Sequence, residues 1–170
     1  MLAILIQSLC FDRIVLSKDD IFKQNSEERK MIRFTNDITP EEYMELRKIV
    51  GWLEFPAEEA KVCVENAYLM ICVRDDEKAI GLARLLWDGG YVAFLSDVLV
   101  VPEYQGQGLG RQLVEAVIQR IRDDMKPGYK VKLTLNSAMG KEPFYEKFGF
   151  KVRPNENAGP AMDQWLAMDI

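Results

Sequence analysis

The segment from Leu99 to Arg111 has residue types and spacing that can do chemistry. It reads Leu-Val-Val-Pro-Glu-Tyr-Gln-Gly-Gln-Gly-Leu-Gly-Arg, so an apolar run passes through Gly106, Gly108 and Gly110 directly into an amphipathic stretch. Glycine adopts backbone angles closed to other residues, and the free amides at a helix start favour negative charge. A strand, a glycine loop and a helix in this order predict a binding site for a phosphate or pyrophosphate.

Spacing separates the known kinds of phosphate loop. A P-loop needs Lys followed by Ser or Thr after its last glycine, but Gly110 is followed by Arg111 and Gln112. A dinucleotide fingerprint needs G-x-G-x-x-G inside a parallel βαβ unit, and the spacing here is G-x-G-x-G. A glycine-rich turn that binds no ligand stays open as an alternative, because helix entries often carry glycine.

Hydrophobic periodicity predicts the elements that position this loop. Thr39-Pro40-Glu41-Glu42 is a capping box, and Leu113, Val114, Val117, Ile118 and Ile121 have helical spacing. The predicted strands are 31–36, 68–74, 79–87, 91–101, 130–136 and 162–169, and the predicted helices are 40–50, 56–66, 109–125 and 141–148. This order predicts a mixed α/β fold, with a mostly antiparallel twisted sheet of about six to seven strands flanked by about four helices.

Two motifs resemble those of the GNAT superfamily of N-acetyltransferases. The first is (Gln or Arg)-x-x-Gly-x-(Gly or Ala), and Gln105 to Gly110 matches every specified position. The second is a Tyr in a short helix followed by Lys or Arg, one residue, Gly and Phe, which Phe144 to Phe150 resembles closely. Both occur in the family's order with a predicted strand between them, and the resemblance covers residues 31–170.

The resemblance implies an N-acetyltransferase of the GNAT-like acyl-CoA N-acyltransferase fold, with acetyl-CoA as cosubstrate and no metal. The pantetheine arm would hydrogen-bond to the backbone at the end of the strand before the loop, and the pyrophosphate would lie on the loop amides. The implied cofactor-binding residues are Leu99, Val100, Val101, Gln105, Gly106, Gln107, Gly108, Leu109, Gly110, Arg111 and Asn136.

The resemblance also implies the catalytic groups. Tyr145 would give a proton to the departing sulfur, and a backbone N–H near Val98 or Leu99 would polarise the thioester carbonyl. Asp97 is the predicted base for the amine, directly or through water, although a structural carboxylate fits its position as well. Two weaker candidates for the base are Glu54 and Tyr91. The amine would attack directly in a ternary complex, since no cysteine is flanked as a nucleophile.

Composition excludes several kinds of catalytic site and binding partner. The chain has 170 residues and no histidine, which removes the commonest general base, the commonest zinc ligand and the Ser/His and Cys/His catalytic pairs. Its net charge of −5 argues against binding to nucleic acid. The three cysteines, Cys10, Cys63 and Cys72, have no metal-binding spacing and are predicted to be reduced thiols, Cys63 and Cys72 buried. No apolar stretch has the length of a membrane span, so we expect no membrane partner and a cytoplasmic location.

Several questions stay open at this level. Residues 1–30 read as an N-terminal extension, or as translation from a start upstream of Met31, with 31–170 forming the N-acetyltransferase domain. The acceptor is predicted to be a small-molecule amine or a protein or peptide amine, and homodimerisation is possible through an exposed strand edge. Two alternatives to an acetyl-CoA-dependent N-acetyltransferase stay open. One is a module that binds acetyl-CoA without turnover, and the other is an enzyme that uses another acyl-CoA.

Overall fold

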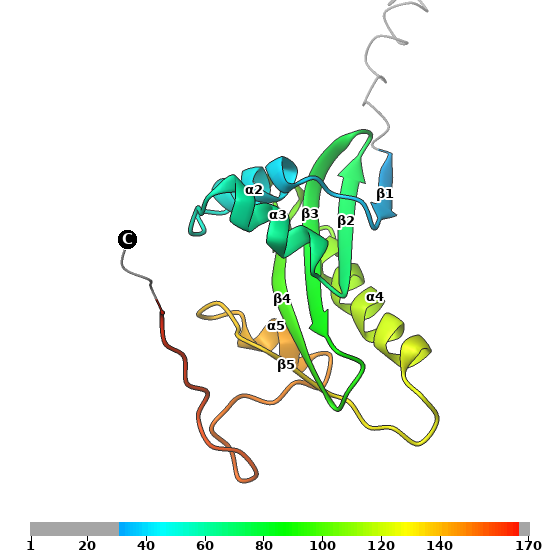
Figure 1. Cartoon of the computed structure of the whole chain (residues 1–170), viewed down its shortest axis with the longest axis vertical. Helices are drawn as coiled ribbons and strands as arrows, with labels where there is room; N and C mark the ends of the chain where they lie inside the picture. The colour runs from blue at the N-terminus through cyan, green and yellow to red at the C-terminus, as the bar shows by residue number, and fades with distance from the viewer. Residues whose placement is uncertain (1–30, 167–170) are drawn as a thin grey trace, which may run out of the picture. The chain divides into compact units, whose positions relative to one another are not determined.

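Residues 31–166 are described in a computed structural model of the chain (Figure 1), and residues 1–30 and 167–170 lie outside the described part. The elements follow the predicted order. They are β1 (Ile32–Thr35), α2 (Pro40–Ile49), α3 (Ala57–Glu65), β2 (Leu69–Asp75), β3 (Lys78–Trp87), β4 (Val92–Val100), a 3-10 turn (Pro102–Tyr104), α4 (Leu109–Asp124), β5 (Lys132–Leu135) and α5 (Glu142–Glu146).

The sheet of the described chain has five strands in the order β1-β2-β3-β4-β5. The first three pairings are antiparallel, and β4 pairs with β5 in parallel. The parallel pairing follows from α4, because a crossover helix returns the chain to the end at which β4 began. The sheet is therefore mixed, and the expectation of six to seven strands is not met within residues 31–166.

The last predicted strand, 162–169, is wrong for its described part. Residues 162–166 form no strand, and residues 167–170 lie outside the described chain. Met162, Trp165 and Leu166 are exposed, so no neighbouring strand covers them in this structure. An apolar pattern indicates strand propensity, but a strand also needs a partner to pair with its backbone.

Helix α2 begins at the predicted capping box. The Thr39 hydroxyl accepts a hydrogen bond from the Glu42 amide at 3.2 Å, and the Glu42 carboxylate accepts one from the Thr39 amide at 3.0 Å. Both amides would otherwise be unpaired at the helix start. The same Glu42 carboxylate accepts two hydrogen bonds from Arg74 of β2, which ties the start of α2 to the sheet.

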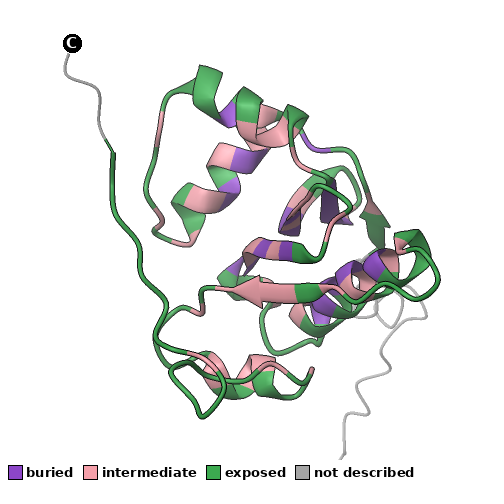
Figure 2. Cartoon of the chain, turned by 60° about the horizontal axis from the view of Figure 1, so that its bottom comes forward, coloured by how far each residue is buried: buried purple, intermediate pink, exposed green. Residues whose placement is uncertain are grey.

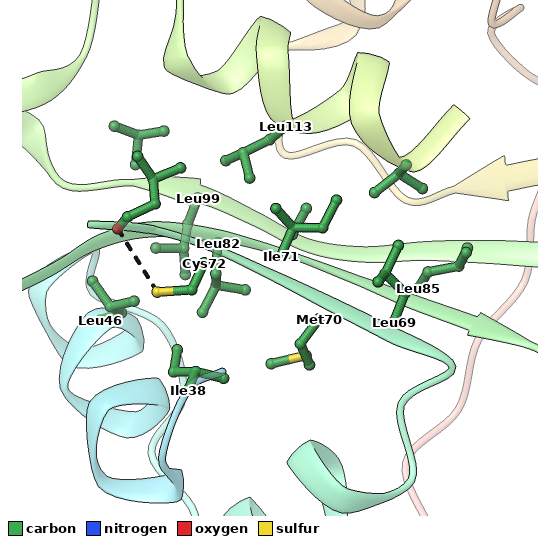
Figure 3. Close-up of a cluster of buried hydrophobic side chains, with 14 of the residues drawn as sticks. Ile38, Leu46, Leu69, Met70, Ile71, Cys72, Leu82, Leu85, Leu99 and Leu113 are labelled. Atoms are coloured by element: carbon green, nitrogen blue, oxygen red, sulfur yellow. Dashed lines mark hydrogen bonds between the residues drawn. The ribbon is translucent and has the colours of Figure 1, made fainter. Parts of the chain in front are cut away.

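Helices cover both faces of the sheet. The side chains of Ile38 and Leu46 approach one face from the α2 side, and Leu113 of α4 approaches the other (Figure 3). Figure 2 shows the buried residues gathered on the strands and on the inner sides of α2 and α4. Among the residues that are almost fully buried are Leu82 and Leu85 of β3. The sheet is thus a single layer between two helical surfaces.

The described cysteines are free thiols, as predicted, but of the two predicted to be buried only Cys72 is. Cys72 is fully buried on β2 and Cys63 is half-buried on α3, and both are free, while Cys10 lies outside the described residues. Burial raises the pKa of the Cys72 thiol to about 11, so it stays protonated at neutral pH. Within residues 31–166, no helix has both the length and the apolar character needed to cross a membrane.

Candidate active site

Strand β4 carries a bulge at the place where it leaves β5. Its pairing with β3 passes from Arg84↔Ser96 to Leu82↔Leu99, so Asp97 and Val98 together lie opposite one residue of β3. Asp97 has a φ of 48°, in the left-handed region that non-glycine residues rarely occupy. The bulge bends the strand and leaves its extra residue out of the ladder.

Beyond Leu95, the edge of β4 that faces away from β3 has no partner strand within the described chain. The parallel pairing with β5 ends at Leu95↔Leu135, while β4 continues to Val100. Strand β5 is short and pairs with β4 along its whole length, so β4 extends past the end of β5 (Figure 1). The side chains of Leu99, Val100 and Val101 are buried in the core, so a ligand can meet these predicted cofactor-binding residues only through their backbone. The Val101 backbone is already paired, because its amide donates to the Ile80 carbonyl and its carbonyl accepts from the Tyr104 amide. A free strand edge can pair with an extended ligand that carries amide groups.

The glycine loop connects this edge to α4. Gly106 and Gly108 have φ values of 75° and 82°, and Gly108 is the N-cap of α4. The Gln105 side chain donates a hydrogen bond to the Val100 carbonyl at 2.8 Å, which fixes the loop to the end of β4. Helix α4 has no side-chain cap and no acidic residue in its first turn, so its first amides are open to an anion.

The remaining loop residues divide between the core and the surface. Leu109 is buried, whereas the Arg111 side chain is exposed and pairs with Glu115 of the same helix. Gln107 is exposed and its side chain donates a hydrogen bond to the Glu103 carbonyl. Leu109 can therefore meet a ligand only through its backbone amide.

Gly110 lies at the contact between the glycine loop and the segment 144–150, the two motifs identified in the sequence. A Cβ atom at this position would lie 3.6 Å from the ring of Phe144 and 3.9 Å from a methyl of Val100. The first turn of α4 thus packs against both the end of β4 and the short helix α5. This contact brings the residue beside Tyr145 next to the glycine loop.

Tyr145 and Asn136 line the same cavity of about 700 Å³. Asn136 follows directly after β5, and Tyr145 lies on α5, so the structure brings these two predicted site residues together. The rings of Phe144 and Phe150 contact the Tyr145 ring edge-on at centroid distances of 4.9 and 6.0 Å. These aromatic contacts hold the phenol in place on one wall of the cavity.

The environment of Tyr145 suits a proton donor. Burial raises the pKa of its phenol above the usual 10.0, so it is protonated at neutral pH. Its hydroxyl makes no hydrogen bond to any other residue in the described range 31–166, which leaves the proton free for a ligand. A neutral phenol can protonate a nearby thiolate. The cavity that Tyr145 lines is bounded by residues of α4, β5, α5 and the segment after α5, and the predicted cofactor-binding residues 99–111 are not among them.

Asp97 has a different environment from the one predicted for a base. Its side chain is 10% exposed, and one carboxylate oxygen accepts a hydrogen bond from Arg47 at 2.8 Å. The other oxygen accepts from the Tyr43 hydroxyl at 2.8 Å and from Arg84 at 3.2 Å. These contacts favour a structural carboxylate, the alternative that the sequence left open. The two weaker candidates, Glu54 and Tyr91, are exposed.

The sequence interpretation missed Tyr43 and Arg47. Both lie on α2 and contact Asp97, which is far away in the chain. One local signal existed: they stand four residues apart, so they share one face of the helix. Buried Leu46 lies beside them on this helix. An arginine and a tyrosine hydroxyl next to the buried side of a helix indicate a buried anionic partner that accepts hydrogen bonds from both.

The fold and the site place the chain in one class of proteins, the acetyltransferases that combine a bulged β4, a shorter parallel neighbour β5 and a glycine loop before a helix. The model of the "Acetyltransferase (GNAT) domain" matches residues 34–160, more than half of the chain. The chain therefore belongs to the GNAT family. This membership confirms the predicted resemblance and the predicted enzyme class, an acyltransferase.

Individual relatives agree with this assignment. The chain is 31% identical over 110 residues to an "Uncharacterized N-acetyltransferase ycf52" of Pyropia yezoensis, covering 62% of this chain and 61% of that protein. It is 28% identical over 149 residues to the protein of the same name in Porphyra purpurea, covering 85% and 77%. The chain thus spans about three fifths of the first relative's length and about three quarters of the second's.

A solved structure has the same fold. A "Probable Acetyltransferase" from methicillin-resistant Staphylococcus aureus superposes with a TM-score of 0.70 at 28% identity. The match covers 79% of this chain and all of that one. The described sheet and helices are therefore those of a GNAT domain.

Proposed function

We propose that this protein transfers the acetyl group of acetyl-CoA to a primary amine by direct attack in a ternary complex. The observation that carries the proposal is that two backbone surfaces adjoin: the β4 edge beyond Leu95, which pairs with no strand of the described chain, and the start of α4, which has no side-chain cap. Gln105 fixes one to the other. An extended ligand that has amides at one end and a pyrophosphate at the other matches this pair.

Acetyl-CoA fits the donor set of these residues. Its pyrophosphate would accept hydrogen bonds from the amides of 106–111, where no carboxylate of the first helical turn competes with it. Its pantetheine amides would pair with the β4 edge at 99–100, since the Val101 amide already donates to the Ile80 carbonyl and the Val101 carbonyl accepts from the Tyr104 amide. No metal is needed, because the helix start supplies the positive end of a dipole.

The reaction is a displacement at the thioester carbonyl. The amine nitrogen attacks the carbonyl carbon, the C–N bond forms, and the C–S bond breaks with its electron pair going to sulfur. Tyr145 gives its proton to the sulfur, and the proton lost by the amine passes through water to restore the phenol. A backbone N–H of the bulge at Val98 or Leu99 stabilises the charge that develops on the carbonyl oxygen. The buried Cys72 thiol is unsuited to carry the acetyl group, because its pKa of about 11 keeps it protonated.

The test combines binding and turnover. Acetyl-CoA is titrated into the full-length protein by calorimetry, and CoA release is then followed with a thiol reagent over a panel of amines. Tyr145→Phe should bind acetyl-CoA normally and lose about 10²- to 10⁴-fold in kcat, the usual contribution of a positioned acid. Tyr129→Phe is the control, because Tyr129 is half exposed and lies in the turn after α4.

Three outcomes would count against the proposal in different ways. Absence of acetyl-CoA binding would reject it entirely. Binding without turnover on any amine would favour the alternative of a binding module. Turnover that is unchanged in Tyr145→Phe would remove Tyr145 from its role as the acid.

A further inference from the structure

The bulge residue Asp97 is held by a set of side chains that the proposed reaction does not use directly. Tyr43 and Arg47 reach it from α2, and Arg84 reaches it from β3. Tyr43 is fully buried, and the Arg47 and Arg84 side chains are 11% and 15% exposed. This cluster of four residues, named here the bulge clamp, links α2, β3 and β4.

The backbone of Asp97 needs such a clamp. A non-glycine residue in the left-handed region is disfavoured relative to an ordinary strand conformation, and it persists only where its surroundings fix it. The ladder cannot fix it, because Asp97 and Val98 share a single opposite residue on β3. The three hydrogen bonds to the Asp97 carboxylate are therefore the contacts that hold this conformation.

Arg47 is itself fixed from the other side. Its guanidinium donates two hydrogen bonds to the Leu53 carbonyl, which lies beyond the end of α2. It also lies over the rings of Trp52 and Phe55, at 5.3 and 4.8 Å from their centroids. A guanidinium stacked on aromatic rings loses little further freedom when it binds a carboxylate. The clamp is thus rigid at the end that faces Asp97.

We propose that Tyr43, Arg47 and Arg84 are positioning residues for acetyl transfer: by holding Asp97 in its left-handed conformation they aim the bulge amides that polarise the thioester carbonyl. Asp97 is then a positioning residue as well, and not the base that takes the amine proton. This inference rests on the proposed function, since the bulge amides matter for catalysis only if a thioester lies beside them.

The chain supplies a matched control. Tyr68, Asp124 and Arg120 form a second cluster of the same residue types, in which the Tyr68 hydroxyl and the Arg120 guanidinium donate to the Asp124 carboxylate. This cluster joins the start of β2 to the end of α4. Tyr43→Phe and Tyr68→Phe therefore each remove one tyrosine–aspartate hydrogen bond, but only the first touches the bulge.

The kinetic test compares these two variants in the full-length protein. We expect Tyr43→Phe to lower kcat about 10-fold while the KM for acetyl-CoA changes less than 2-fold, because the glycine loop is intact. Tyr68→Phe should leave both values unchanged. In bound acetyl-CoA with a ¹³C-labelled carbonyl, the infrared carbonyl frequency should move toward its value in water in Tyr43→Phe alone. If kcat and the carbonyl frequency in Tyr43→Phe match the wild type, the inference is wrong.

A second measurement separates this inference from the proposed function. Amide hydrogen exchange of the ligand-free protein reports the bulge without any turnover. Exchange at Val98 should be about 10-fold faster in Tyr43→Phe than in the wild type, and unchanged in Tyr68→Phe. Unchanged exchange at Val98 in Tyr43→Phe would overturn the clamp even if the protein is an active acetyltransferase. Faster exchange in a protein that binds no acetyl-CoA would reject only the proposed function.

The carbonyl frequency of bound acetyl-CoA in Asp97→Asn and Tyr43→Phe distinguishes positioning from proton transfer. If Asp97 positions the bulge, both variants lower kcat and both move this frequency toward its value in water, although Tyr43 takes no proton. If Asp97 is the base, loss of the Tyr43 hydrogen bond also disturbs proton transfer, so kcat falls in both variants while the carbonyl frequency of bound acetyl-CoA stays at the wild-type value; an unchanged frequency in both variants would overturn the inference.

Discussion

The change of Gly108 to alanine tests the anion site at the start of α4 more directly than any other substitution. Gly108 has a φ of 82°, and an added Cβ would meet no protein atom within 4 Å. Gly128, in the turn after α4, has a φ of 83° and the same open surroundings. Gly108→Ala and Gly128→Ala therefore carry the same backbone penalty with no steric clash, and any difference between them must come from a ligand.

The expected magnitudes follow from this match. A left-handed conformation costs a non-glycine residue about 1–2 kcal/mol, so both variants should lose that much stability. In a chain of this size each kcal/mol lowers Tm by about 2–4 °C. Only Gly108→Ala places a methyl group where the pyrophosphate would lie. The loss of one hydrogen bond to a charged group is worth about 1.5–3 kcal/mol. The Kd of acetyl-CoA should then rise roughly 10- to 100-fold.

The assay is calorimetric titration of acetyl-CoA into both variants, with thermal unfolding followed in parallel. Similar losses in Tm together with a selective loss of affinity in Gly108→Ala are the expected result. Equal Kd values for the two variants would refute the reasoning that places the pyrophosphate on α4. A Gly128→Ala variant with weakened binding would show that the effect is general destabilisation.

Three further outcomes are expected. A Cβ on Gly81 would lie 2.9 Å from a backbone carbonyl of β4, so Gly81→Ala should lower both Tm and kcat, whereas Gly159→Ala, which meets no atom within 4 Å, should change neither. The hydrogen bond from Arg74 lowers the pKa of Glu42 below its usual 4.5, so the stability that this pair contributes is present above pH 4.5 and is lost as the pH falls through the lowered pKa. Acid unfolding of Glu42→Gln should lack this part of the pH dependence. An acid transition identical to that of the wild type would contradict this role of the pair. Because burial raises the pKa of Tyr145 above 10.0, kcat should not fall on the alkaline side until the pH exceeds 10, and that fall should be absent in Tyr145→Phe.

The parts of the fold that depend on nearby residues could be predicted from the sequence. The capping box of Thr39 and Glu42 forms as expected, because its partners are three residues apart. The glycine loop also lies between a strand and a helix as expected, with Gly108 at the helix cap. Local geometry and side-chain type decide such features, and both are visible in a short window of sequence.

The parts that depend on distant partners could not be predicted. Nothing near Asp97 in the chain indicates that Tyr43 and Arg47 surround its carboxylate, or that its backbone is left-handed. Residues 162–166 include the apolar Met162, Trp165 and Leu166 and begin the predicted strand 162–169, yet no edge of the described sheet pairs with them. Pairing and ion contacts across the fold are tertiary features, and they override the local pattern.

The placement of helices on opposite faces of one sheet has a consequence for how substitutions can alter the acceptor specificity of such an enzyme. Helix α4, which follows the glycine loop, lies on one face of the sheet, and α2 lies on the other (Figure 3). The contacts with the bulge residue Asp97 come from α2. Substitutions on α2 can thus alter the bulge without touching the loop that we assign to the cosubstrate. Directed evolution toward a new amine should accumulate changes in α2 and the residues after it, and leave 105–111 constant.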